Sequence, residues 1–366
     1  MTKELQRNEE MAVFSLRSLY KRYGYLPYKM SKFEEYELYS KNKDFLVSDR
    51  VITFNDTNGK LMALKPDVTL SIIKNAEEYE GVKSKVYYNE NVYRVSESTH
   101  QYKEIMQTGL ECIGDIDLYD IYEAVLLAAK SLECISESFI LDISHLDILA
   151  AVLDGVSADG KIKGEILDCI KEKNTHDIER ICRQNGIGED DLALLSSLAS
   201  IYGKLSDIIP TLEGICKTER AQTALCEIKE LYSLLCGSGY EDRIYFDFSI
   251  VSNMKYYSGI VFKGFLDGIS SGVLSGGRYD RLMQRMGRKS GAVGFALYLD
   301  LLEGLGGEGD GYDVDVLLLY DDTVSTEKIK NAVNKLTFEG KSVTAQKAVP
   351  EKLRTKETVK LWEAEI

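Results

Sequence analysis

Histidines, paired cysteines and long apolar runs are all scarce in this 366-residue sequence. The three histidines, His100, His145 and His176, stand far apart without metal-ligand spacing, so we expect no metal site. No pattern places a nucleophile beside a base, and we expect neither catalytic residues nor a cofactor. No stretch approaches the roughly 18 apolar residues that cross a bilayer. The first residues also lack the apolar run of a secretory signal.

The cysteines and the charge balance narrow the class of protein further. The seven cysteines form no Cys-x-x-Cys pair, which indicates reduced thiols in a cytoplasmic protein with no membrane partner. Lys and Arg number 45 against 59 Asp and Glu, so the net charge is −14. A protein that grips a nucleic-acid backbone usually has a basic surface, so this balance argues against tRNA as a partner.

The hydrophobic pattern predicts one large mixed domain over residues 1–303. The elements expected in its first half are a helix at residues 8–23, short strands within 45–93, a helix from Pro66 to residue 75, a β-hairpin of Val86–Arg94 with Glu104–Gly114, and a helix at 118–135. Residues 150–240 then have helical patterns, for example at 189–203, and no convincing strand, so we interpret them as a helical insertion. Strand patterns return at Ile244–Val251 and Gly259–Phe265, before a glycine-rich turn expected at Gly272–Gly277.

A glycine-rich linker, residues 304–311, separates this domain from a short one at 312–366. Gly304, Gly306 and Gly309 have the spacing of a dinucleotide-binding turn. Such a site needs the turn between a strand and a helix, and here it follows a helix and precedes a strand, so we expect no nucleotide there. The short domain begins with a β-α-β pattern and is expected to be α/β.

One strand of the predicted hairpin carries the most informative set of polar residues. Gln107, Gly109 and Glu111 alternate and therefore share one face, and the small glycine leaves room between the two polar side chains. Arg94 ends the facing strand. Together they are suited to a zwitterion, with Glu111 for an ammonium, Arg94 for a carboxylate and Gln107 for orientation. From the pattern alone, a sheet face exposed to solvent is an equally good interpretation of these residues.

Three other segments are candidates, each with a plainer interpretation beside it. Asp67 and Thr69 could contact a ligand, or could simply begin a helix after Pro66. Tyr256 and Tyr257 could line a pocket, although paired tyrosines more often pack in a core. The glycine-rich turn through residues 275–280 could let a ligand approach the backbone, although a hairpin turn is commoner.

Four regions, in the same order along the chain, resemble histidyl-tRNA synthetase, a class II aminoacyl-tRNA synthetase, over about residues 8–303. They are Leu64–Thr69, the hairpin from Tyr93 to Glu111, Val251–Tyr257, and Gly276–Asp280 with Ala292–Ala296. The resemblance implies an α+β fold with an antiparallel sheet flanked by helices, the helical insertion, and a small C-terminal α/β domain. It also implies a homodimer, although Ser31 replaces the proline usual at that family's dimer seam.

The same comparison shows where this chain departs from a synthetase. The family's catalytic arginine falls at Ser252, its ATP-holding arginine at Leu301, and the small glycine near the adenine at Tyr298. An ungapped alignment puts Glu97 where a further arginine belongs. Amino-acid activation builds charge at the α-phosphate, and losing one fixed positive contact costs about 10² to 10³ in rate. We therefore expect no useful activation by ATP.

The residues that match the family's histidine-binding positions are Arg94, Gln107, Glu111, Tyr256 and Tyr257, whereas Asp67 replaces a glutamate there. With Asp67 and Thr69 they form the expected histidine site. A synthetase-like chain with this pocket, without the ATP arginines and with a shortened C-terminal domain resembles the regulatory subunit of ATP phosphoribosyltransferase. Lys65–Thr69 and Asp142–Leu149 also fit that family. The implied role is a non-catalytic partner of a short catalytic subunit, in a hetero-oligomer expected to be an octamer.

That complex would make phosphoribosyl-ATP from ATP and phosphoribosyl pyrophosphate, the first step of histidine biosynthesis, and histidine feedback would couple a regulatory site to the distant catalytic site. The pocket could instead be a relic, with regulation at a subunit interface. The remaining alternatives are a divergent histidyl-tRNA synthetase, and an amino-acid-sensing synthetase paralogue with another partner.

Overall fold

The computed structural model describes residues 8–46, 50–96, 99–251, 256–305 and 312–363. One compact unit comprises residues 9–303, and another contains residues 304–366. Each unit has its own sheet and its own core. Within the described residues, every helix is too short or too polar to span a bilayer.

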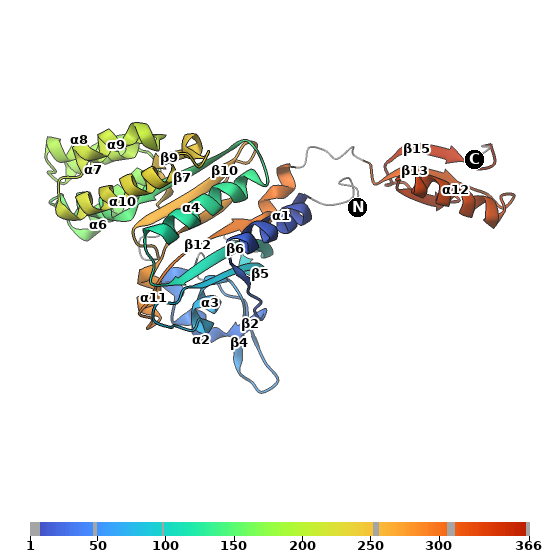
Figure 1. Ribbon diagram of the computed structural model, residues 1–366, viewed down its shortest axis with the longest axis horizontal. Helices are drawn as coiled ribbons and strands as arrows, with labels where there is room; N and C mark the ends of the chain where they lie inside the picture. Colours follow the sequence, from blue (N-terminus) through green and yellow to red (C-terminus); the bar gives the residue numbers. More distant parts are fainter. Residues whose placement is uncertain (1–7, 47–49, 97–98, 252–255, 306–311, 364–366) are drawn as a thin grey trace. The chain divides into compact units, whose positions relative to one another are not determined.

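A nine-stranded sheet organises the larger unit (Figure 1). In spatial order its strands are β1 (Leu26–Pro27), β5 (Ser84–Val95), β6 (Tyr102–Gly114), β12 (Gly291–Tyr298), β11 (Leu274–Arg278), β10 (Ile260–Leu266), β7 (Phe139–His145), β9 (Ile244–Asp247) and β8 (Tyr202–Lys204). Neighbouring strands are antiparallel except for the pairs β1–β5 and β7–β9, which are parallel. The predicted hairpin is therefore present as β5 and β6, the two longest strands.

Two long helices, α1 (Asn8–Arg22) and α4 (Leu118–Glu133), cover one face of this sheet (Figure 1). Helix α4 begins at Asp117, whose carboxylate accepts hydrogen bonds from the backbone N–H groups of Tyr119 and Asp120 in a capping box. Its apolar side packs on β7, β10, β11 and β12. The helices meet where the Tyr20 and Ser131 hydroxyls lie 3.0 Å apart. These two helices do not cover the opposite face of the sheet, and the candidate functional site lies on that face.

A smaller three-stranded sheet borders that opposite face, in the order β2 (Phe33–Glu35), β4 (Leu61–Leu64), β3 (Thr53–Asn55). Three short helices are close to this small sheet in sequence or share its hydrophobic core. They are α2 (Tyr36–Ser40), α3 (Thr69–Asn75) and α11 (Asp280–Arg285). Helix α3 begins at Thr69, so the prediction that it starts at Pro66 is wrong. The Asp67 carboxylate accepts a hydrogen bond from the Leu70 backbone N–H at 2.8 Å, and this side-chain contact turns the chain just before the helix.

The helices within and beside the expected insertion are α5 (Leu146–Gly155), α6 (Gly160–Lys171), α7 (Thr175–Gln184), α8 (Glu189–Ser200), α9 (Leu205–Ile215) and α10 (Glu219–Leu235). The prediction that this region has no strand is wrong, because β8 pairs with β9 at the edge of the large sheet. Tyr202 stacks on Tyr245 across that pair with ring centroids 5.4 Å apart. Helix α8 accordingly ends at Ser200, before the predicted end at residue 203.

Most of the glycine-rich segment expected to form a turn is instead the interior strand β11, so the predicted turn is wrong. Close approach of a ligand to this segment stays a prediction. A side chain on Gly276 would overlap Phe295 and Phe262, and one on Gly277 would come within 2.7 Å of the Ile260 carbonyl oxygen. Glycine is needed here because the neighbouring strands and rings pack closely, and no turn conformation is required.

The smaller unit contains β13 (Val314–Leu319), α12 (Thr326–Phe338), β14 (Val343–Gln346) and β15 (Thr355–Lys360). The first three coincide with the predicted β-α-β pattern, and β15 was not predicted. The strands form a parallel sheet in the order β14-β13-β15, with Val316, Leu318, Ala332 and Leu336 in its core. Residues 306–311 of the expected linker lie outside the described residues, and Leu299–Leu305 form a 3-10 helix.

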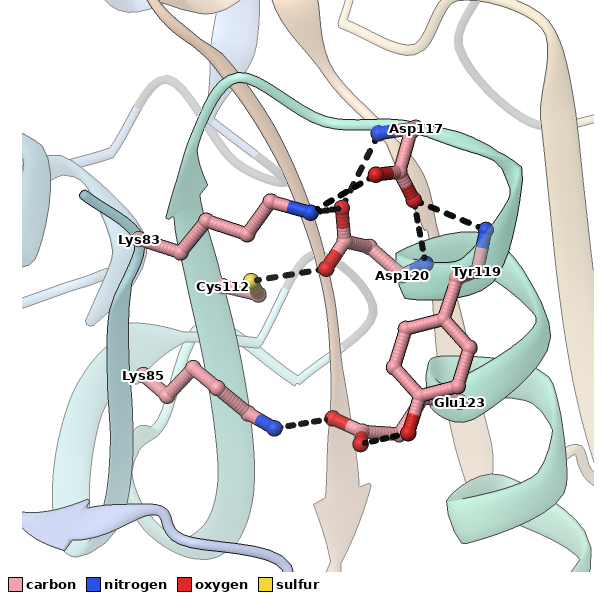
Figure 2. Close-up of polar contacts among 7 residues, drawn as sticks. All are labelled: Lys83, Lys85, Cys112, Asp117, Tyr119, Asp120 and Glu123. Carbon is pink, nitrogen blue, oxygen red and sulfur yellow. Dashed lines mark hydrogen bonds and ion pairs between the residues drawn. The ribbon is translucent and has the colours of Figure 1, made fainter. Parts of the chain in front are cut away.

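A ladder of ion pairs fastens β5 to α4 on the helix-covered face (Figure 2). Lys83 donates to Asp117 at 2.9 Å and to Asp120 at 2.6 Å, and Lys85 contacts Glu123 at 2.5 Å. Asp120 is only 4% exposed and also accepts from the Asp117 backbone N–H. Because the Asp120 and Glu123 carboxylates are largely removed from water, the ladder is expected to stabilise the fold more than a surface ion pair does.

We therefore expect Lys83→Met to lower the free energy of unfolding by about 1–3 kcal/mol, because it leaves the buried Asp120 carboxylate without its cation. Urea denaturation measures the change. Lys161→Met is the matched control, since Lys161 is 86% exposed and its nitrogen lies 3.9 Å from Glu165. This control should change the value by less than about 0.5 kcal/mol. Equal effects of the two substitutions would show that the ladder contributes no more than surface charge.

Candidate functional site

A cavity of about 450 Å³ lies on the face of the large sheet that α1 and α4 leave open. All seven residues predicted to form a site line it: Asp67, Thr69, Arg94, Gln107, Glu111, Tyr256 and Tyr257. They come from the start of α3, both strands of the hairpin, and the segment before β10. The fold therefore brings together four sequence segments that are far apart along the chain.

Strand β6 forms the floor of the cavity, because every second side chain along it points to the cavity face of the sheet. Gln107 and Glu111 face the cavity and are 3% and 2% exposed, whereas Leu110 and Cys112 face the helices. The alternative of a solvated sheet face is therefore wrong. The expected room above Gly109 is also absent, because a side chain there would lie 2.6 Å from the Tyr88 hydroxyl oxygen. Tyr88 sits directly across from Gly109 on β5 and occupies that space.

Glu111 is held by hydroxyl groups at the bottom of the cavity. The Thr69 hydroxyl donates to one carboxyl oxygen at 2.7 Å, and the Tyr279 hydroxyl donates to the other. Burial raises the pKa of Glu111 to about 8, the two hydroxyl hydrogen bonds oppose this rise, and the nearby Asp67 charge adds to it. The carboxyl group lies over Gly294, where even a methyl group would overlap it.

Arg94 lies at the rim of the cavity between backbone and side-chain acceptors. Its Nε donates to the Pro66 carbonyl oxygen at 3.1 Å, and its guanidinium hydrogen-bonds to the Tyr298 hydroxyl. Burial raises the pKa of Asp67, while the Leu70 backbone N–H and the Arg94 charge oppose the rise. Tyr298, at the position where the resembling family has a small glycine, therefore stands inside the cavity and contacts the arginine.

Aromatic rings form the remaining wall. The centroid of Tyr256 lies 4.5 Å from that of Tyr257, 5.9 Å from that of Tyr279 and 6.2 Å from that of Phe45. Such edge-on and tilted rings make a surface for a flat or cationic group. The sequence did not mark the lining residues Phe45, Tyr88, Lys263 and Tyr298 as ligand contacts, whereas Tyr279 lies in the candidate segment 275–280. Tyr88 could have been found from its place opposite Gly109, but Phe45 and Lys263 carry no local signal.

Two of the positions expected to have lost arginines, Ser252 and Glu97, lie outside the described residues. Leu301 is half-buried in the 3-10 helix after β12 and does not line the cavity. Within the described part of the chain, no cluster of His, Cys, Asp or Glu is placed to hold a metal ion. The arrangement can therefore bind a small polar molecule through one guanidinium, one ammonium, two carboxyl groups, an amide and several hydroxyls.

Comparison with known proteins identifies the family. The family model described as histidyl-tRNA synthetase matches residues 2–302. An ATP phosphoribosyltransferase regulatory subunit from Clostridium kluyveri is 30% identical over 319 residues, covering 84% of this chain and 81% of the relative.

Solved structures agree on the fold. A structure from Bacillus halodurans C, described as an ATP phosphoribosyltransferase regulatory subunit/histidyl-tRNA synthetase, superposes with a TM-score of 0.76 at 23% identity and covers 98% of this chain and 96% of that one. An ATP phosphoribosyl transferase complex from Thermotoga maritima superposes with a TM-score of 0.63 at 19% identity, covering 78% and 96%. The predicted class II synthetase-like α+β fold is thus confirmed. Because the match to the Clostridium protein spans most of both chains, this chain belongs to the family of ATP phosphoribosyltransferase regulatory subunits, built on the histidyl-tRNA synthetase fold.

Proposed function

We propose that the chain is a non-catalytic, cytoplasmic subunit that binds and activates a short-form ATP phosphoribosyltransferase, and that histidine in its cavity carries the feedback signal. The observation that carries this proposal is a cavity whose buried polar groups, among them Thr69, Gln107 and Glu111, suit a small zwitterion. Its relatives are named regulatory subunits of that transferase. The chain is proposed to act as a homodimer within a hetero-octamer.

The chemistry of histidine fits the groups that line the cavity. Arg94 has terminal guanidinium nitrogens beside its bonded Nε, and these can hold a carboxylate. Glu111 can take an ammonium, and the Gln107 amide can orient the ligand from the same strand. The tilted rings of Tyr256, Tyr257 and Tyr279 offer a surface for the imidazole.

Amino-acid activation is not supported by the same cavity. Among the lining residues that the structure describes, Arg94 and Lys263 are the only cationic side chains, and Asp67 and Glu111 place carboxyl groups where a triphosphate would add more negative charge. Activation needs several fixed positive groups around the α-phosphate. We also propose that Ser252 and Leu301 stand where a synthetase has its catalytic and ATP-holding arginines.

We expect the purified chain to co-elute with the short catalytic subunit and to raise its rate of phosphoribosyl-ATP formation at least tenfold, because a regulatory subunit must stabilise the active state of its partner. Histidine should inhibit the complex. Gel filtration with light scattering and a phosphoribosyl-ATP absorbance assay measure both effects. Absence of co-elution and of any rate gain would instead favour a sensing paralogue with another partner. ATP–pyrophosphate exchange with histidine above background would favour a divergent synthetase.

Calorimetry with histidine on the wild type and on Glu111→Ala tests the location of the ligand. The variant should bind at least about tenfold more weakly, since a charge-assisted contact is worth roughly 1.5–3 kcal/mol. Equal binding by both proteins would place histidine elsewhere, as at a subunit interface, and leave this cavity a relic of the synthetase fold.

A further inference from the structure

The Glu111 carboxyl group is surrounded by hydroxyls and not by cations. It is 2% exposed, and its two oxygens accept from Thr69 and Tyr279. None of the ion pairs among the described residues includes Glu111. An ionised carboxylate without a cation is costly at such a buried position, and this cost outweighs the two hydroxyl hydrogen bonds, which by themselves favour the ionised form.

Among the residues that the structure describes, the other cations of the cavity are engaged elsewhere or come from a more distant strand. Arg94, on β5, is engaged with the Pro66 carbonyl and Tyr298, and it lies beside the second carboxyl group, Asp67. Lys263 lines the cavity from β10, three strands away from β6. The remaining titratable groups that line the cavity are tyrosines from four segments: Tyr88, Tyr256, Tyr257, Tyr279 and Tyr298. Two carboxyl groups therefore share a site with one nearby guanidinium.

We infer that histidine enters this cavity by proton exchange: its ammonium takes the place of the Glu111 proton, which leaves to solvent. The O–H bond of the acid breaks, the carboxylate forms an ion pair with the ligand ammonium, and one proton passes to the buffer. This inference rests on the proposed histidine site and adds its regulation, because acidification would weaken the feedback signal at constant histidine concentration.

The direction of the pH dependence follows from the titration of the free protein. The pKa of Glu111 is raised to about 8 by burial, so most molecules hold the proton at neutral pH. Below this pH the histidine ammonium must displace a proton from Glu111. The affinity for histidine should therefore rise by about fivefold between pH 7 and pH 8. Above it the carboxylate is already ionised and the dependence on this group should level off.

The test is calorimetric titration of the full-length chain with L-histidine at pH 7.5, in phosphate and in Tris, which differ in ionisation enthalpy. The dependence of the binding heat on the buffer gives the number of protons released. We expect about three-quarters of a proton per bound histidine in the wild type, the fraction of Glu111 protonated at that pH. Glu111→Gln, which has no proton to release, should bind weakly and show no buffer dependence.

Asp142→Asn is the matched control. Asp142 is another buried carboxyl group whose pKa burial raises, here to about 7, but it lies on β7 and does not line the cavity. This variant should release the same number of protons as the wild type. Binding of histidine to the wild type with no proton release would overturn the inference while leaving the histidine site intact, and so would an unchanged release in Glu111→Gln. A wild type that binds no histidine would overturn the proposed function itself.

Discussion

Replacing Gly294 by alanine is expected to weaken histidine binding by about ten- to a hundredfold. A methyl group on Gly294 would overlap the Glu111 carboxyl oxygen and the Leu110 carbonyl oxygen across the β6–β12 pair. The overlap with the backbone oxygen strains the pairing of β6 with β12 and lowers stability. The overlap with the carboxyl oxygen drives the Glu111 side chain away from its Thr69 and Tyr279 donors. Loss of a contact to a charged group of roughly 1.5–3 kcal/mol corresponds to about ten- to a hundredfold in affinity.

Gly264→Ala separates this effect from simple loss of stability. A methyl group on Gly264 would come within 2.7 Å of Leu132 Cδ1, the end of a flexible side chain on α4, on the face of the sheet away from the cavity. We expect this control to lower the melting temperature and to keep wild-type affinity for histidine, measured by calorimetry below the unfolding transition. Wild-type affinity in Gly294→Ala would show that Glu111 is not part of the binding site.

The sequence predicted the polar face of β6, because side chains alternate strictly along a strand and Gln107 and Glu111 therefore share one side. It did not reveal which way that side faced, because burial depends on helices and loops that pack from far along the chain. For the same reason the sequence did not show that Phe45 and Lys263 line the cavity, since both come from other segments. Glycines 276 and 277 were misleading because a strand packed closely against its neighbours needs the same small residue as a turn.

Glu111→Gln is expected to become more stable than the wild type as the pH rises, by roughly 4 kcal/mol between pH 5 and pH 8. In the folded wild type the pKa of Glu111 is about 8, whereas in the unfolded chain the group titrates near its ordinary value of about 4.3. The stability contributed by this group is complete below pH 4 and is lost as the pH rises toward 8, because the unfolded chain releases the proton and the folded chain keeps it. Glutamine does not titrate, so the variant avoids this loss.

Urea denaturation of both proteins across this pH range measures the difference directly. Other groups titrate alike in the two proteins and cancel when the wild-type value is subtracted. Asp142→Asn offers a second curve of the same kind, whose difference from the wild type should level off near pH 7, where the pKa of Asp142 lies, and not near pH 8. Parallel curves for Glu111→Gln and the wild type would mean that Glu111 is ionised in the free protein. In that case the cavity would already hold its negative charge before any ligand arrives, and histidine would bind without releasing a proton.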